Sequence, residues 1–172
     1  ASMLTKLSRF FTAPAPAKAP DTLVFAPLSG MLLPLEEVTD TAFAQKMLGD
    51  GLVVIPDDSL VLAPFDGSVV ATVPSSHAIG LISPDGLECL IHVGINTVAL
   101  QGQGFRLLVE QGQTVSKGMP LIELDLAFLR NAHQDLATPI VVTNGADWQI
   151  HSLCQHPRVT AGSDILFTAR KC

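Results

Sequence analysis

Short apolar runs alternate with clusters of Gly, Pro and Asp from Leu23 to the end of the chain. Runs of this length, bounded by turn-forming residues, are typical of β-strands. Helical turns are expected only at residues 41–48 and 126–132. The spacing predicts an all-β fold, a compact antiparallel β-sandwich or barrel with short helical turns. We expect strands at residues 23–25, 30–34, 52–56, 59–62, 67–72, 78–83, 88–93, 105–109, 120–124, 139–143, 149–153 and 165–169.

A short segment occurs twice and favours an internal duplication. APLSG at residues 26–30 recurs as APFDG at residues 63–67. Each copy enters an apolar run at its glycine, as expected where glycine supplies a turn with positive φ. The motif alone is a common turn, but two copies that precede similar strands favour a duplicated half-sandwich.

The first residues differ in character from the rest of the chain. Leu4, Leu7, Phe10 and Phe11 recur at helical spacing, with basic residues between them. A helix of one or two turns is too short to be stable alone in water, but it can form on an anionic membrane surface. A frayed terminus is the alternative. Because an Ala- and Pro-rich tether follows, we divide the chain into an N-terminal stretch, residues 1–21, and a folded domain, residues 22–172.

The composition excludes several classes of protein. Of 172 residues, 48% are hydrophobic and only 15% are charged, which excludes a disordered chain. The net charge is −6, from 10 Lys and Arg against 16 Asp and Glu, so no nucleic-acid partner is expected. No apolar run approaches about 18 residues, so no membrane span is expected. Cys89, Cys154 and Cys172 form an odd set without close spacing, typical of reduced thiols in a cytoplasmic protein.

Two histidines flank a predicted hairpin. His77 precedes one apolar run, His92 lies near the end of the next, and Pro-Asp-Gly at residues 84–86 between the runs is a hairpin signal. If the Pro-Asp pair forms a two-residue turn, the histidines face each other directly. If the Asp-Gly pair forms it, they lie diagonally on the same face. Either register brings their Cβ atoms within about 4.5–8 Å, whereas a bulge that changes the parity of pairing would separate them.

Neighbouring imidazoles suit a small set of functions. They can bind zinc, act as a base with its orienting partner, or pass a phosphoryl group. Imidazole nitrogen is a nucleophile near neutral pH, because its pKa of about 6.5 leaves it largely unprotonated. Phosphoryl transfer has a loose transition state, so the protein mainly positions the group and stabilises its charge. A structural pair bonded to backbone groups is the other interpretation.

The chain resembles the glucose-type enzyme IIA of the bacterial phosphoenolpyruvate-dependent sugar phosphotransferase system. The resemblance covers residues 24–171 and implies a β-sandwich with a shallow apolar depression that holds the histidine pair. It is carried by APLSG at 26–30, AFAQK at 42–46, GDG at 49–51, A-P-x-D-G at 63–67, HA at 77–78, H-x-G-I-x-T-V at 92–98, G-x-G-F at 102–105 and TP at 138–139.

The resemblance implies a phosphocarrier, and so a phosphotransferase component that requires no cofactor. His92 corresponds to the histidine phosphorylated on Nε2, and His77 to the second histidine, which hydrogen-bonds the phosphoryl group. Ser75 stands where the family usually has a threonine that supports the second histidine. The implied donor is phosphorylated HPr, and the implied acceptor is a cysteine on the IIB domain of a sugar permease. Regulatory target proteins are also implied, with a zinc ion bound by His77 and His92 and completed by a partner's carboxylate.

The resemblance further implies a rim around the histidines that contacts partner proteins. Val73 and Leu90 are aliphatic where the family has phenylalanine, and Asn96 occupies a position that is commonly Asp, so this rim attracts a basic partner less strongly. Core packing is the alternative for the apolar members. The predicted rim consists of Asp40, Phe43, Val73, Ile79, Leu90, Asn96 and Val98.

A zinc-dependent hydrolase that uses the His77/His92 pair is the main alternative function. Catalytic zinc usually takes three protein ligands and a water. The remaining histidines, His133, His151 and His156, have no matching spacing and are expected on the surface. VSKG at residues 115–118 superficially resembles the hairpin of a lipoyl or biotinyl carrier, and a structural adaptor is the last alternative.

Overall fold

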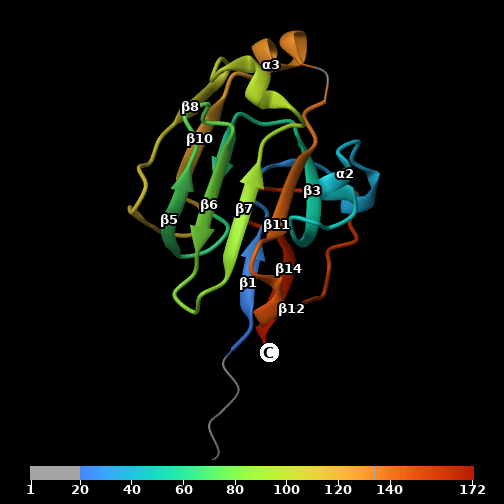
Figure 1. The fold of residues 1–172 in the computed structure, drawn as a ribbon, viewed down its shortest axis with the longest axis vertical. Helices are drawn as coiled ribbons and strands as arrows, with labels where there is room; N and C mark the ends of the chain where they lie inside the picture. Colours follow the sequence, from blue (N-terminus) through green and yellow to red (C-terminus); the bar gives the residue numbers. More distant parts are fainter. Residues whose placement is uncertain (1–19, 134) are drawn as a thin grey trace, which may run out of the picture.

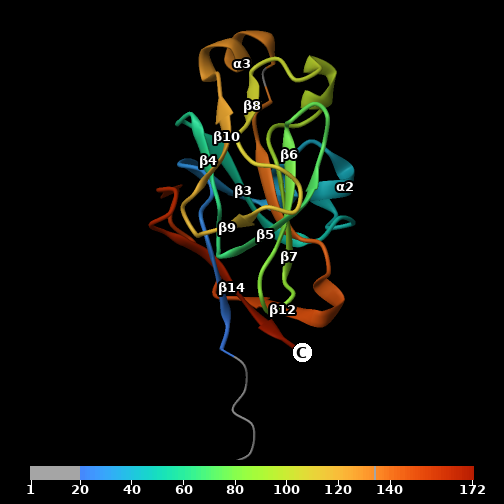
Figure 2. The same cartoon turned by 90° about the vertical axis from the view of Figure 1, so that its left-hand side faces the viewer.

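The computed structural model describes residues 20–172 apart from residue 134 (Figure 1). The large sheet has eight strands in the order β13-β2-β3-β11-β7-β6-β5-β9, and two smaller sheets have the orders β4-β10-β8 and β1-β14-β12. In Figure 2 the sheet of β4, β10 and β8 lies opposite strands β5, β6 and β7, and β1, β14 and β12 lie toward the lower end.

The strands and helices have the following bounds, given in chain order. The strands are β1 (Thr22–Phe25), β2 (Gly30–Pro34), β3 (Asp50–Pro56), β4 (Leu60–Leu62), β5 (Gly67–Thr72), β6 (Ala78–Ile82), β7 (Glu88–His92), β8 (Phe105–Leu107), β9 (Thr114–Val115), β10 (Pro120–Leu124), β11 (Thr138–Val142), β12 (Trp148–His151), β13 (Arg158–Val159) and β14 (Ile165–Lys171). The helices are α2 (Thr41–Ala44) and α3 (Leu126–Ala132), with 3₁₀ turns η1 (Leu35–Glu37), η2 (Thr97–Leu100) and η3 (Gly145–Asp147).

The central strands of the large sheet bury one face completely. Ile79 and Leu81 in β6, and Cys89 and Ile91 in β7, are at most 1% exposed. The residues that alternate with them in β7, including His92, are half-buried. This alternation follows from the two-residue period of a strand. His92 therefore belongs to the open face of a strand that is anchored in the core.

The repeated segment packs against its own copy through reciprocal hydrogen bonds. The Phe25 N–H donates to the Pro64 carbonyl at 3.0 Å, and the Leu62 N–H donates to the equivalent Pro27 carbonyl at 2.8 Å. The glycine of each copy begins a strand, β2 or β5, and a Cβ there would lie 1.9 or 2.1 Å from a carbonyl oxygen of the neighbouring strand. Only glycine permits so close an approach. This reciprocal contact is what the predicted internal duplication requires.

The hairpin of β6 and β7 has a three-residue loop where a two-residue turn is predicted. The Ser83 N–H donates to the Leu87 carbonyl at 2.9 Å, and Gly86 completes the loop with φ of +95°. Hairpin loops of three residues end with a residue in this left-handed region. The resulting register sets Ala78 opposite His92. Both registers predicted for the histidines are therefore wrong.

The predicted antiparallel β-sandwich is confirmed, with differences at its short elements. The two-residue strands β9 and β13 have no counterpart among the predicted strands, because so short a run shows no alternation. The helix predicted at residues 41–48 ends at Ala44, since Lys46 adopts φ of +59° and breaks the helical path. The 3₁₀ turns η1, η2 and η3 lie where no helical turn is predicted.

Only the last residues of the N-terminal stretch are among those that the structure describes. The predicted amphipathic helix with Leu4, Leu7, Phe10 and Phe11 lies outside the described residues. β1 begins at Thr22 and pairs with β14, close to the C-terminal end of the chain (Figure 1). No helix among the described residues is both long and apolar enough to cross a membrane.

Replacing Gly86 by Ala tests the hairpin loop. A Cβ at Gly86 would meet nothing within 4 Å, so the substitution adds only the cost of a positive φ at a residue with a side chain. We expect Gly86→Ala to lower the free energy of unfolding in urea by about 1–2 kcal/mol. Gly145 is the control, because its surroundings are equally open and its φ is not positive. Equal stability of Gly86→Ala and Gly145→Ala would contradict this account of the loop.

Candidate functional site

His92, the last residue of β7, has its ring held by a backbone carbonyl. Its Nδ1 lies 2.8 Å from the Gly94 carbonyl oxygen. A carbonyl oxygen only accepts, so Nδ1 carries the proton and the neutral ring presents an unprotonated Nε2. Gly94 has φ of +76°, and a Cβ there would lie 2.4 Å from Thr97 Cγ2. Glycine is therefore required for the chain to turn back onto the ring.

The His77 ring lies against that of His92, although His77 does not belong to a strand. It precedes β6 and follows Ser76, whose φ of +58° redirects the backbone. The parity of strand pairing therefore does not govern its side chain. Its ring lies edge-on to the His92 ring, with centroids 4.8 Å apart. The two rings meet, although for a different geometric reason than the predicted one.

The two rings differ in exposure and in their hydrogen-bond partners. His77 is 6% exposed, whereas His92 is half-buried, so of the two rings that of His92 is the more accessible to solvent. Ser75 Oγ lies 2.7 Å from His77 Nδ1. When this hydroxyl donates to Nδ1, the neutral His77 ring carries its proton on Nε2 and has an N–H group to offer.

Burial favours the neutral form of both rings. Desolvation lowers the pKa of His77, and the neighbouring His92 lowers it further. Desolvation also lowers the pKa of His92, opposed by its hydrogen bond to Gly94 and by the nearby Asp40 carboxylate. A neutral His92 with an unprotonated Nε2 is a nucleophile at pH 7.

Helix α2 brings an aromatic ring to one side of the pair. Asp40 caps this helix, because its Oδ1 accepts from the Phe43 N–H at 3.1 Å. The Phe43 ring centroid lies 5.2 Å from that of His92, and the Phe105 centroid lies 6.3 Å from that of His77. These rings lie against the histidines and contribute to the burial that lowers the pKa values of both.

The predicted rim divides into surface and core. Phe43 is 4% exposed and touches His92 from within the protein. Ile79 is 1% exposed and pairs with Ile91 on the inner face of the sheet, so its prediction as a rim residue is wrong. The exposed or half-buried members are Asp40, Val73, Leu90, Asn96 and Val98.

The residues that hold the loop after His92 have no signal in the local sequence. The Ile95 N–H donates to the Asp135 carbonyl at 3.1 Å, and the Ile95 carbonyl accepts from His133 Nε2. The Asp135 carboxylate also accepts from Thr39 Oγ1 at 2.9 Å. His133 is half-buried, so its expected surface position is wrong. These contacts join distant segments, whereas the glycine two residues after His92 is visible in the sequence.

The described residues offer no complete metal site. No group of three or more His, Cys, Asp and Glu side chains within them is arranged to hold a metal ion. His77 and His92 supply two ligands, fewer than catalytic zinc usually takes. His156 is exposed, and His151 is half-buried and bonded to Asp21 at 2.8 Å, so neither joins the pair. The geometry gives the hydrolase alternative no support.

The three cysteines lie outside this chemistry. Cys89, Cys154 and Cys172 are free thiols, in buried, half-buried and exposed positions respectively. Burial raises the pKa of the Cys89 thiol to about 12. Cys89 is therefore an inert core residue, since the thiolate is the reactive form.

Comparison with known proteins shows the family to which this chain belongs. The family model described as phosphoenolpyruvate-dependent sugar phosphotransferase system, EIIA 1, matches residues 22–148. Among solved structures, glucose permease IIA from Mycoplasma capricolum has a TM-score of 0.80 and 31% sequence identity, covering 87% of this chain and 96% of that chain. Because the family match spans well over half of the sequence, this chain belongs to the EIIA 1 family and is a phosphotransferase component of the phosphoenolpyruvate-dependent sugar phosphotransferase system.

Proposed function

We propose that this chain accepts a phosphoryl group from phosphorylated HPr on His92 Nε2 and passes it to a cysteine of the IIB domain of a sugar permease. Membership of the family supports this class of reaction. The hydrogen bond from His92 Nδ1 to the Gly94 carbonyl supports the choice of atom, because it leaves Nε2 as the unprotonated nitrogen.

Each step exchanges one bond to phosphorus for another. In the first, the lone pair of His92 Nε2 forms a bond to phosphorus while the bond between phosphorus and HPr breaks and its electrons leave with HPr. The proton on Nδ1 stays on the ring, where the Gly94 carbonyl stabilises the positive charge that the ring acquires. In the second, a thiolate of the IIB domain attacks phosphorus, and the N–P electrons return to Nε2.

His77 is suited to stabilise the phosphoryl group. Its ring lies edge-on to His92, and Ser75 at Nδ1 leaves Nε2 available as a donor. Charge spreads over the phosphoryl oxygens in the transition state, so a preoriented N–H group lowers the barrier. Ser75 thus has the supporting role that the family gives to a threonine.

The surface beside His92 suits weak, exchangeable protein contacts. Asn96 and Val98, four and six residues after His92, are exposed and offer one polar and one apolar side chain to a partner. The net charge of −6 favours encounter with basic partners in a salt-dependent way. We extend the proposal to regulatory target proteins, to a zinc ion completed by such a partner's carboxylate, and to peripheral membrane contact through the N-terminal stretch.

Substitution of His92 tests the acceptor directly. We expect His92→Ala to abolish labelling by phosphoenolpyruvate, enzyme I and HPr, because the substitution removes the nitrogen proposed to receive the phosphoryl group. The measurement is incorporation of radiolabelled phosphate, followed by mapping of the modified residue. The control is His156→Ala, which removes an exposed histidine and should be labelled like the native protein. Labelling of His92→Ala at the native rate would refute the assignment.

Substitution of His77 tests the second role. Loss of one preoriented donor typically costs about 10²–10³ in rate, or about 3–4 kcal/mol, so His77→Ala should slow transfer from HPr by up to that factor. His77→Gln retains a side-chain N–H donor and should lose less. Stopped-flow transfer rates provide the measurement. Native rates in both variants would show that His77 takes no part in transfer.

The pH dependence follows from the lowered pKa values. A free imidazole becomes half protonated near pH 6.5, about its ordinary pKa. Because burial lowers the pKa of His92, its neutral form should persist below that pH, and protonation should appear only on further acidification. Titration of the ring by ¹⁵N NMR measures this directly, with N-acetylhistidine as the reference compound. A His92 midpoint at or above that of the reference would contradict the prediction.

A further inference from the structure

The peptide group between Gly94 and Ile95 lies at the centre of a hydrogen-bond network that extends beyond the histidine pair. Its carbonyl accepts from His92 Nδ1 at 2.8 Å, and its N–H donates to the Asp135 carbonyl at 3.1 Å. The next carbonyl, that of Ile95, accepts from His133 Nε2. The backbone that orients His92 is therefore held on its other side by His133 and Asp135.

The loop that contains this peptide needs support from outside. Gly94 has φ of +76° and Asn96 has φ of +61°. A left-handed backbone at a residue with a side chain costs about 1–2 kcal/mol. Asn96 is also the N-cap residue that precedes η2, and its side chain makes no capping hydrogen bond. The loop keeps this shape because the surrounding contacts stabilise it.

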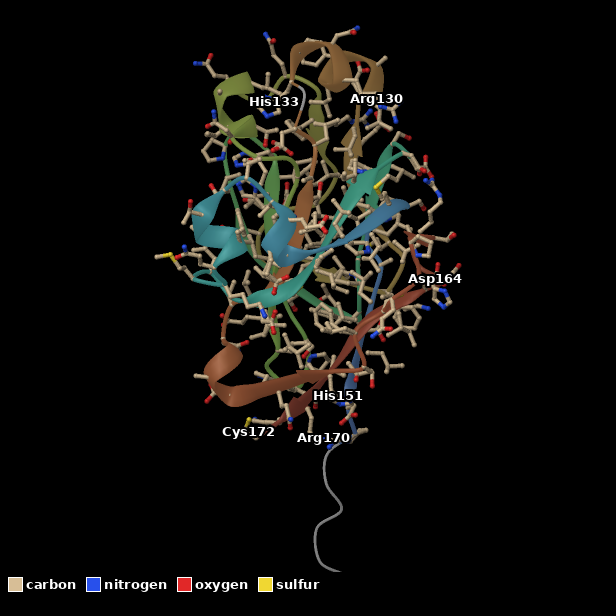
Figure 3. All side chains as sticks on the ribbon, turned by 90° about the vertical axis from the view of Figure 1, so that its right-hand side faces the viewer. Arg130, His133, His151, Asp164, Arg170 and Cys172 are labelled. Atoms are coloured by element: carbon tan, nitrogen blue, oxygen red, sulfur yellow. The ribbon has the colours of Figure 1, made fainter. Side chains whose placement is uncertain are left out.

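His133 is attached to the core through helix α3. The His133 N–H donates to the Leu129 carbonyl at 2.8 Å at the end of the helix, and Leu129 is fully buried. At the other end, Asp125 caps the helix by accepting from the Phe128 N–H at 3.1 Å. Figure 3 shows His133 at the end of the molecule where α3 lies, with His151 at the opposite end. The His133 ring is thus a fixed point against which the loop is held.

We propose that His133 is a positioning residue for phosphoryl transfer, because its hydrogen bond to the Ile95 carbonyl fixes the loop whose Gly94 carbonyl holds the His92 Nδ1 proton. The inference rests on the proposed phosphocarrier role of His92. Without the His133 bond the peptide between Gly94 and Ile95 is freer to rotate. The His92 ring then populates the tautomer with its proton on Nε2, which has no lone pair there to attack phosphorus.

The test compares three variants in transfer from phosphorylated HPr. His133→Leu keeps the bulk of the side chain without a donor, and His133→Gln restores a side-chain N–H. His151→Leu is the matched control, because His151 is also half-buried and hydrogen-bonded but lies far from the site. Loss of a hydrogen-bond partner that orients a metal-binding side chain typically lowers activity about 10–100-fold. By analogy with that effect, we expect His133→Leu to lower the maximal rate about tenfold. His133→Gln should recover most of that loss, and His151→Leu should match the native rate.

Two further measurements separate positioning from a general structural effect. The KM for phosphorylated HPr should stay close to its native value in His133→Leu, since the nucleophile rather than the docking surface is altered. ¹⁵N NMR should show the His92 proton on Nδ1 in the native protein and in His133→Gln, with a shift toward Nε2 in His133→Leu. Native kinetics in His133→Leu, or an unchanged His92 tautomer, would overturn the proposal.

Failure of folding or of the proposed function leaves the inference testable. If His133→Leu does not fold, the tautomer of His133 in the native protein decides the question, again by ¹⁵N NMR. A neutral His133 with its proton on Nδ1 would have no Nε2–H to donate, and this result would overturn the proposal. If HPr does not phosphorylate native His92, the proposed function fails. The tautomer of His92 in the three variants still reports whether His133 positions the ring.

Discussion

The His92 Nδ1–H group and the Gly94 carbonyl oxygen are two residues apart in the chain and 2.8 Å apart in space. This contact forms because β7 ends at His92 and the chain turns back at Gly94 with φ of +76°. It selects one of the two ring nitrogens for chemistry and fixes the direction in which that nitrogen points. The fold can be understood as the set of constraints that keep this short turn in place.

Two of those constraints come from opposite directions. From below, β7 is paired on both sides, with β6 and β11, and its inward residues are fully buried. From above, His133 and Asp135 bond the loop that contains Gly94. If only β7 held the His92 ring, the loop that contains Gly94 could still move. If only the loop held the ring, the strand that carries His92 would not be fixed. Together they give the half-buried His92 ring a defined tautomer.

Partial burial is a compromise between reactivity and access. Desolvation lowers the pKa of His92, which keeps the ring neutral as the proposed nucleophile must be, but full burial would prevent the proposed partner proteins from reaching it. The two histidine rings differ in how far they are buried. His77 is buried and bonded to Ser75, while His92 stays half-buried. A half-buried ring beside a buried one suits the proposed transfer between partner proteins.

The sequence by itself determined the longer strands but not the two-residue strands β9 and β13, because alternation between turn residues is a local property that needs several residues to appear. Its motifs indicated the family and the histidine pair. It did not determine the register of the hairpin, because Gly86 adds a third residue to the loop. The sequence also did not determine whether Ile79 is buried, since alternation gives a strand two faces and only packing decides which face is buried. The support of Ile95 by His133, 38 residues away, was decided by tertiary structure alone. Hydrogen bonds across that separation depend on how α3 packs, and no local pattern records it.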